Sequence, residues 1–194
     1  MAVLRQYEEK NREQRASLIN EKHEEEQVRI LAYTDLLTGC YNRQYANEIL
    51  RSFWDTEETF TFCFVDLDGL KKVNDVMGHI EGDEYIRLAA KAIGNFIRKE
   101  DYLFRYGGDE FLIVSRTLTP DIVGRRMEQV NEALAQESVR RKITLKMAVS
   151  YGVAAREESA SLDELIRLAD PVSYTHLDVY KRQPYMPGNG VCGR

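Results

Sequence analysis

Residues 102–114 read Tyr-Leu-Phe-Arg-Tyr-Gly-Gly-Asp-Glu-Phe-Leu-Ile-Val, and they form the strongest structural signal in the chain. Two short runs rich in β-branched and aromatic residues, 102–106 and 110–114, flank Gly107, Gly108 and Asp109. Glycines supply the positive backbone φ that a tight turn needs. The pattern therefore predicts a β-hairpin of two antiparallel strands joined by a glycine turn.

Outward from this hairpin, the chain alternates between helical and strand-like patterns. Apolar spacing predicts helices over 42–54 and 82–98 and strands over 60–66 and 143–154. Thr119 followed by Pro120 is typical of a helix start, and Ser161 with Glu164 forms a capping box for a last helix. The order predicts an α/β domain whose sheet contains an antiparallel hairpin.

Two acidic pairs lie at the ends of the predicted strands. Asp66 and Asp68 end the strand 60–66, and Asp109 and Glu110 occupy the hairpin turn. If a hairpin strand packs beside 60–66, the four carboxylates come together, and clustered carboxylates generally hold a cation between them. Oxygen ligands favour Mg²⁺, which shares its remaining positions with water and phosphates. The predicted chemistry is phosphoryl or nucleotidyl transfer.

The two glycines of the turn extend this interpretation. Gly107 and Gly108 have no side chains, so a bulky triphosphate can approach the backbone there. Taken alone, however, acids at strand ends and Gly-Gly-Asp turns are also common features of protein surfaces. The other motifs of the chain are needed to choose between the two interpretations.

Length and composition limit the possible functions. A chain of 194 residues with 43% hydrophobic and 30% charged residues fits one soluble domain with an extension. The net charge of −5 argues against a broad nucleic-acid-binding face. The longest apolar runs, such as 62–65, are too short to span a bilayer, and no signal segment opens the sequence. Three cysteines without metal-ligand spacing favour a reducing compartment, so we expect a cytoplasmic location.

Residues 1–32 form a separate zone, rich in Glu, Arg, Lys and Gln and without Gly or Pro. We expect one long helix here. Spacing by seven gives a weak apolar seam that includes Leu4, Leu18, Tyr7 and Val28. A solvated single helix is the alternative, and we favour a coiled coil because of the domain that follows.

Five blocks of the sequence resemble motifs of the GGDEF family of diguanylate cyclases, in the family's order. The first resemblance is letter for letter, from Arg105 to Phe111. The others are an opening motif, two central blocks and a late strand, at 35–43, 64–75, 78–84 and 149–154. The resemblance covers residues 33–170. It implies a mixed, mainly antiparallel sheet flanked by helices, similar to the palm of nucleotide cyclases and polymerases.

The resemblance implies a magnesium- or manganese-dependent enzyme that joins two GTP molecules into cyclic di-GMP. Asp66 and Asp109 would bind the metal, helped by the carbonyl oxygen of Leu67. Glu110 would support the site by assisting deprotonation of the attacking 3′-hydroxyl. Lys71 would contact the triphosphate as a point charge.

The guanine base would be recognised by Asn74 and Asp83. A carboxylate accepts hydrogen bonds from guanine N1–H and its amino group, while an amide both donates and accepts. Adenine lacks that donor pair, so this choice favours GTP over ATP. Structural alternatives exist for each residue: Lys71 as a solvated helix lysine, Asn74 as a turn former and Asp83 as a helix cap.

Two further properties are implied by the resemblance. Each domain would hold one GTP, so a homodimer joined through the N-terminal helix would complete the active site. Arg98 and Asp101 match the Arg-x-x-Asp form of a product-inhibition site, although they also fit an ordinary charged helix end. Membrane attachment would come only through an upstream domain that the sequence does not contain.

The sequence departs from the family at Leu70, where an aromatic residue is usual, and seriously after Asp170. The family continues its last helix with Tyr, Lys and Arg, whereas Pro171 follows here. Residues 172–183 can be encoded by DNA that, with the end of the Pro171 codon, equals its own reverse complement. We therefore interpret 171–194 as a translated sequencing adapter and the catalytic domain, 33–170, as truncated. The alternative function is an impaired module that binds GTP or cyclic di-GMP as a sensor.

Overall fold

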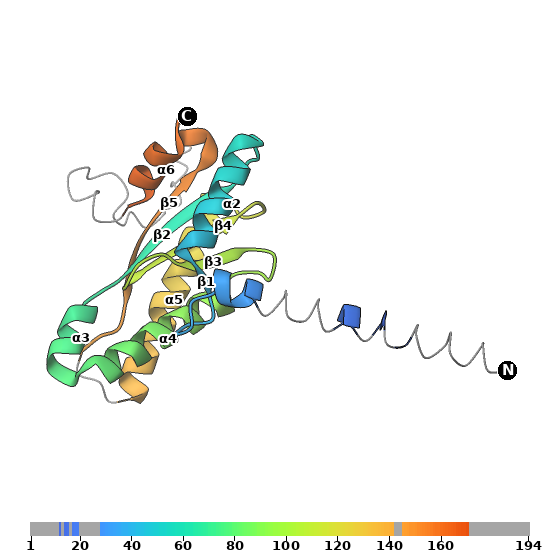
Figure 1. Ribbon diagram of the computed structural model, residues 1–194. Helices are drawn as coiled ribbons and strands as arrows, with labels where there is room; N and C mark the ends of the chain where they lie inside the picture. The colour runs from blue at the N-terminus through green and yellow to red at the C-terminus, as the bar shows by residue number, and fades with distance from the viewer. Residues whose placement is uncertain (1–11, 13, 16, 20–27, 142–144, 171–194) are drawn as a thin grey trace, which may run out of the picture.

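A computed structural model describes residues 12, 14, 15, 17–19, 28–141 and 145–170 (Figure 1). Its centre is a five-stranded sheet in the order β1-β3-β4-β2-β5. Neighbouring strands are antiparallel except β1 and β3, which are parallel. The strands are β1 (Tyr41–Asn42), β2 (Thr61–Leu67), β3 (Tyr102–Arg105), β4 (Glu110–Ser115) and β5 (Val149–Ala155). The predicted mixed, mainly antiparallel sheet is confirmed.

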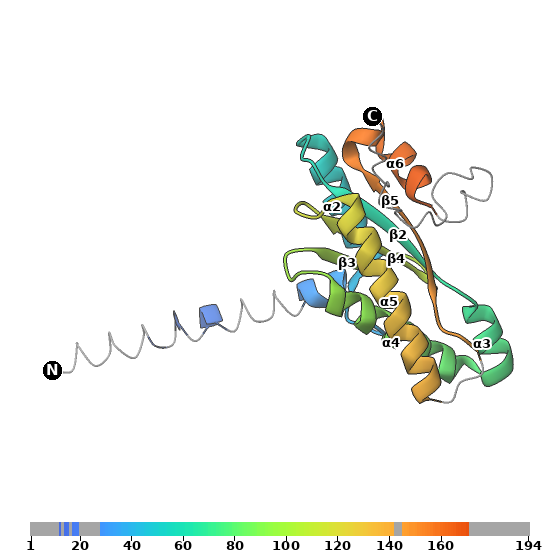
Figure 2. The same ribbon diagram turned by 180° about the vertical axis from the view of Figure 1, so that it is seen from behind.

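Helices cover both faces of this sheet, and Figures 1 and 2 show them from opposite sides. The helices are α2 (Arg43–Asp55), α3 (Leu70–Met77), α4 (His79–Phe96), α5 (Pro120–Arg140) and α6 (Leu162–Ala169), with a short 3₁₀ helix at Arg156–Glu158. Helices α4 and α5 pack on one face, whereas α2 and α6 pack on the other. Helix α3 follows β2 and packs against α4.

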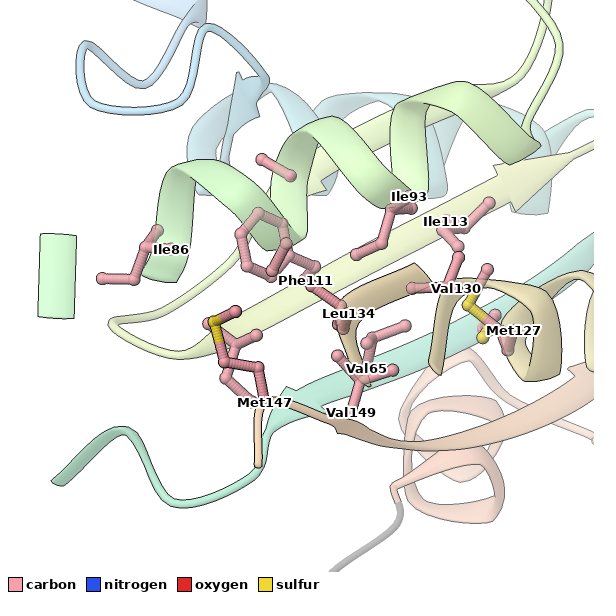
Figure 3. Packing of buried hydrophobic residues seen from close by; sticks show 14 of the residues in the cluster. Val65, Ile86, Ile93, Phe111, Ile113, Met127, Val130, Leu134, Met147 and Val149 are labelled. Carbon is pink, nitrogen blue, oxygen red and sulfur yellow. The ribbon is translucent and has the colours of Figure 1, made fainter. Parts of the chain in front are cut away.

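Strand β2 is apolar on both faces because both are covered. Cys63, Val65 and Leu67 point into the core beneath α4 and α5, whereas Phe62 and Phe64 point toward α2 and α6. This is the two-residue period of a strand buried on both sides. Figure 3 shows the first core, where side chains of the sheet meet those of α4 and α5. Burial of each large apolar side chain contributes about 1.5–3 kcal/mol, so these two cores fix the position of β2 and of the acidic residues at its end.

The hairpin is present, but the reason given for its glycines is wrong. Neither Gly107 nor Gly108 has a positive φ. The turn is closed by the N–H groups of Tyr106 and Gly107, which both donate to the carbonyl oxygen of Glu110 at 2.8 and 3.2 Å. Among the glycines that the structure describes, positive φ angles occur instead at Gly39, Gly69 and Gly78.

Two predicted boundaries also need correction. Helix α4 begins at His79, three residues before the predicted start, because Gly78 (φ 91°, ψ 164°) separates it from α3. Strand β5 begins at Val149 rather than at 143. Its partner β2 ends at Leu67, which lies opposite Val149, so the apolar alternation before Val149 has no strand to pair with. Residues 142–144 lie outside the described part of the chain.

The residues next to α6 in the sequence determine where this helix begins and ends. Ser161 Oγ accepts a hydrogen bond from the N–H of Glu164 at 3.2 Å. The Glu164 carboxylate accepts from the N–H of Ala160 at 2.8 Å rather than from Ser161, so only half of the predicted capping box forms. After Ala169 the backbone of Asp170 is extended (φ −69°, ψ 113°), which is the conformation favoured before a proline.

The N-terminal zone is described only in part. Residues 12, 14, 15, 17–19 and 28–33 are helical. The segment 28–33 is joined to the domain, because Asn42 Nδ2 donates to the carbonyl oxygen of Ala32 at 2.7 Å and the rings of Tyr33 and Tyr45 lie 4.7 Å apart. Most of the predicted coiled coil and the whole tail 171–194 lie outside the described residues. Among the described helices, none combines the length and the apolar character needed to cross a bilayer.

Candidate active site

The sheet register brings the two acidic pairs together. Asp66, at the end of β2, lies opposite Glu110, the first residue of β4. The N–H of Leu67 donates to the carbonyl oxygen of Asp109 at 3.0 Å. The close approach predicted from the two strand ends is therefore confirmed, and Asp66, Leu67, Asp109 and Glu110 share one end of the sheet.

The negative charges of these clustered carboxylates repel one another when no cation is bound. Burial, followed by the charges of Asp109, Glu110, Asp68 and Asp170, raises the pKa of Asp66 to about 6. Carboxylates held close together against their mutual repulsion favour a bound cation that neutralises them.

The donor set fits a hard divalent cation. Every candidate ligand is an oxygen, from the carboxylates of Asp66 and Asp109 and the carbonyl of Leu67, and oxygen donors suit Mg²⁺ or Mn²⁺. Within the described residues, no three side chains of Asp, Glu, His or Cys form a complete metal-binding group. A metal here would therefore take further ligands from water or phosphate, which is how Mg²⁺ is usually bound.

Glu110 folds back over the glycine turn. A Cβ atom added to Gly107 would lie 2.2 Å from Glu110 Oε2, so the missing side chain makes room for this carboxylate. Nothing lies within 4 Å of the equivalent position on Gly108. The open backbone expected for a triphosphate is thus found at Gly108, while the space at Gly107 is filled by Glu110. Burial, then Asp109 and Asp170, raise the pKa of Glu110, against the opposing charge of Arg43.

A tyrosine supports the loop that follows Asp66. The buried hydroxyl of Tyr85 in α4 lies 3.1 Å from the carbonyl oxygen of Asp68 and 2.6 Å from that of Ala148, and it accepts from the N–H of Ala148 at 3.0 Å. Ser150 Oγ donates to Asp68 Oδ1 at 2.7 Å. Asp68, named with Asp66 from the sequence, is therefore held by β5 and α4.

The candidate nucleotide residues lie on α3 and α4. Lys71 and Asn74 belong to α3, and Asp83 lies in the second turn of α4. Within the described residues, none of the three side chains has a hydrogen-bond or ion-pair partner. Asp83 is not a helix cap, since Gly78 holds that position, and Asn74 lies inside a helix rather than in a turn. The alternative for Lys71, an exposed helix lysine, agrees with its position.

Arg98 and Asp101 lie between α4 and β3, at the opposite end of β3 from the glycine turn that carries Asp109. The N–H of Arg98 donates to Asp101 Oδ2 at 2.8 Å, while Asp101 Oδ1 is buried without a partner among the described residues. The hydrogen bond between the Arg98 N–H and the Asp101 carboxylate thus closes a local turn.

Sequence reasoning missed two charged residues of the site. Arg43, the last residue of the opening motif, lies over the Tyr106 ring at 4.6 Å and opposes the acidic charges at Glu110. Asp170 adds a negative charge to the group from the end of α6. Neither could be found from local spacing, because each reaches the site only through the packing of α2 or α6.

Comparison with known proteins agrees with this geometry. The family model described as diguanylate cyclase, GGDEF domain, matches residues 32–179. The chain belongs to the GGDEF family. A probable diguanylate cyclase of Escherichia coli K12, DgcJ, is 33% identical over 147 residues, which is 74% of this chain and 29% of that protein. Diguanylate cyclase DgcM of the same organism is 29% identical over 161 residues, covering 81% of this chain and 39% of that protein.

A solved structure has the same architecture as this GGDEF domain. The coiled coil and GGDEF domain of DgcB from Caulobacter crescentus, in complex with c-di-GMP, gives a TM-score of 0.73 at 27% identity. The match covers 86% of this chain and 92% of that one. The chain thus spans nearly all of this structure, but less than two-fifths of the two Escherichia coli relatives.

Proposed function

We propose that the chain is a diguanylate cyclase that condenses two GTP molecules into cyclic di-GMP and two pyrophosphates. Each 3′-hydroxyl oxygen forms a bond to the α-phosphorus of the other nucleotide, and the bond from that phosphorus to pyrophosphate breaks. The observation that carries the proposal is the register of Asp66 opposite Glu110 beside Asp109. Membership of the GGDEF family supports it.

The acidic residues would have different functions, metal binding and proton acceptance, according to their positions. Asp66, Asp109 and the Leu67 carbonyl would hold Mg²⁺ or Mn²⁺, which when bound neutralises the phosphates and activates the hydroxyl. Glu110, which lies opposite Asp66 and next to Asp109, would accept the 3′-hydroxyl proton. Gly108 leaves open backbone for the triphosphate.

Helices α3 and α4 bind the rest of the nucleotide. Lys71 contacts the phosphates, while Asn74 and Asp83 read the guanine edge. The absence of side-chain partners for these residues within the described ranges supports the assignment, since their hydrogen-bonding groups are available to a ligand.

Two copies of the chain would form the complete enzyme. The N-terminal helix would hold two domains so that their GTP sites face each other, which converts an encounter between molecules into an intramolecular step. The solved relative DgcB includes a coiled coil next to its GGDEF domain. We place the reaction in the cytoplasm, with any membrane attachment through an upstream domain.

Product would bind at Arg98 and Asp101 and inhibit the enzyme. Arg98 is exposed and can form paired hydrogen bonds to a guanine edge or a phosphate. The position of these residues, at the opposite end of β3 from the glycine turn, makes this a separate site.

The substitution Asp109→Asn tests the catalytic assignment. It removes one metal-binding charge from a turn, so the fold should remain while turnover falls at least about 10²-fold. Product formation and circular dichroism should be measured for both proteins. Near-normal turnover by the variant would contradict the metal-site proposal.

A sensor is the second candidate function. Helix α6 ends at Ala169, and the family's phosphate-binding residues of that helix have no counterpart in the described chain. A sensor would bind a non-hydrolysable GTP analogue or cyclic di-GMP in calorimetry but form no product from GTP.

We also propose that residues 171–194 are translated adapter sequence. Replacing them with a family-like helix that carries Tyr, Lys and Arg should raise activity at least tenfold, because charge-assisted phosphate contacts are each worth about 1.5–3 kcal/mol. Sequencing the genomic DNA across the Asp170 codon directly tests whether residues 171–194 belong to the gene. A continuous genomic reading frame through residue 194 would overturn this proposal.

A further inference from the structure

Gly82 of α4 lies directly against the side chain of Asn74 in α3. A Cβ atom added to Gly82 would lie 1.8 Å from Asn74 Oδ1 and 2.8 Å from its Cγ. The contact joins two helices that pack side by side (Figure 1). The space that any other residue would use at position 82 is therefore filled by the Asn74 amide.

The backbone does not explain this glycine. Gly82 lies inside α4, its φ is not positive, and its N–H donates to the carbonyl oxygen of Gly78 at 3.2 Å, as in a regular helix. Glycine inside a helix costs about 1 kcal/mol relative to alanine. The close approach of Asn74 is the structural reason for a glycine at this position.

Packing, rather than hydrogen bonding, sets the position of the Asn74 amide. Within the described residues this amide has no hydrogen-bond partner, so its donor and acceptor are available to a ligand. Its orientation depends on the surface against which it packs, and Gly82 provides that surface one residue before Asp83.

We infer that Gly82 is a positioning residue for guanine specificity, which holds the Asn74 amide where the base edge must lie. The inference rests on the proposed function, in which Asn74 and Asp83 read guanine. The atom that an alanine side chain would displace is the end of a flexible side chain. Alanine at position 82 would therefore move Asn74 until the contact reached at least 3.4 Å, and leave the helices in place.

The test compares Gly82→Ala with Gly94→Ala in the full chain. Gly94 lies in the same helix, and nothing lies within 4 Å of its added Cβ, so it controls for helix propensity. We expect G82A to weaken binding of a non-hydrolysable GTP analogue at least about tenfold, as expected when a hydrogen-bonding group is misplaced. Preference over the matching ATP analogue should fall by a similar factor. G94A should bind like the wild type, and neither variant should have a lower Tm.

A double-mutant cycle separates positioning from a general structural effect. In an Asn74→Ala background, G82A should cause no further loss of affinity, because the amide that it displaces is absent. Wild-type affinity and specificity in G82A, or an additive loss in the double variant, would overturn the inference. Binding with this pattern but without turnover would overturn only the cyclase proposal. A wild-type chain that binds no guanine nucleotide would overturn both.

Discussion

Arg105 contacts both carboxylate oxygens of Asp35 at 3.2 Å, across 70 residues of sequence. The same guanidinium donates to the carbonyl oxygen of Gly108 at 2.9 Å. Asp35 also accepts hydrogen bonds from the N–H and the hydroxyl of Thr38 at 2.9 and 2.7 Å. The opening motif, just after the segment 28–33, is therefore tied to the turn that carries Asp109.

Asp35→Asn should lower the free energy of unfolding by about 1.5–3 kcal/mol, the usual contribution of a hydrogen bond to a charged group. Asparagine can still accept from Thr38, so the variant removes mainly the charge opposite Arg105. Urea denaturation measures the change. Glu58→Gln is the matched control, because the Arg116–Glu58 pair is exposed and such pairs contribute about 0–1 kcal/mol. Equal effects of the two substitutions would contradict a special role for Asp35.

The contribution of Asp35 should depend on pH in one direction. Burial alone would raise the pKa of Asp35, but the hydrogen bonds from Thr38 and the charge of Arg105 outweigh it and hold the pKa of this carboxyl group below its ordinary value. A carboxyl group with a lowered pKa stabilises the fold above its unfolded pKa, about 3.9, and loses this effect as pH falls through the folded value. The stability difference between wild type and D35N should be constant from pH 7 to 5 and shrink below pH 4. A stability difference between wild type and D35N that grows as the pH falls would contradict a lowered pKa for Asp35.

Tyr85→Phe should destabilise the chain by about 1–3 kcal/mol, because it leaves the part-buried N–H of Ala148 without its partner. The carbonyl oxygen of Ala148 loses one hydrogen bond and keeps the one from the N–H of Asp68. The loop containing Asp68 would lose the same support, so the Mg²⁺ concentration for half-maximal activity should rise. Urea denaturation and a magnesium titration measure the two effects. Phe53→Leu, in the other core, is the control that should lower stability without changing the magnesium requirement.

Arg98→Ala should leave the initial rate unchanged and delay the slowing caused by product. Its backbone N–H, which donates to Asp101, remains, so Tm should also stay the same. Asp101→Ala should relieve inhibition too, but with a lower Tm, because the buried turn loses its acceptor. Progress curves with added cyclic di-GMP measure the effect. Equal inhibition of R98A and wild type by cyclic di-GMP would contradict the proposed product site at Arg98.

The sequence was sufficient to predict four of the five strands of the sheet and the acidic group, but not the two-residue strand β1. Strand patterns around Asp66 and Asp109 predicted that the two carboxylates meet, because adjacent antiparallel strands place the end of one beside the start of the other. Local signals also placed the starts of α5 and α6, since a proline at the first helical position and a serine cap act within one turn.

Features that depend on packing between distant elements were not predictable. The start of β5 depends on where β2 ends, and the role of Gly107 depends on the path of the Glu110 side chain. Helix α3 is only eight residues long and is separated from α4 by a single glycine, Gly78, so its periodicity was too short to recognise. Arg43 and Asp170 reach the site from helices that pack on the sheet, which no single motif records.

Product analysis of the full chain tests the central claim most directly. The chain should be incubated with GTP and Mg²⁺, and nucleotides and pyrophosphate should be quantified by chromatography over time. We predict one cyclic di-GMP for every two pyrophosphates released, and no product when Mg²⁺ is chelated. GTP that is bound but unchanged, or converted to GDP and phosphate, would contradict the proposal that this site joins two nucleotides.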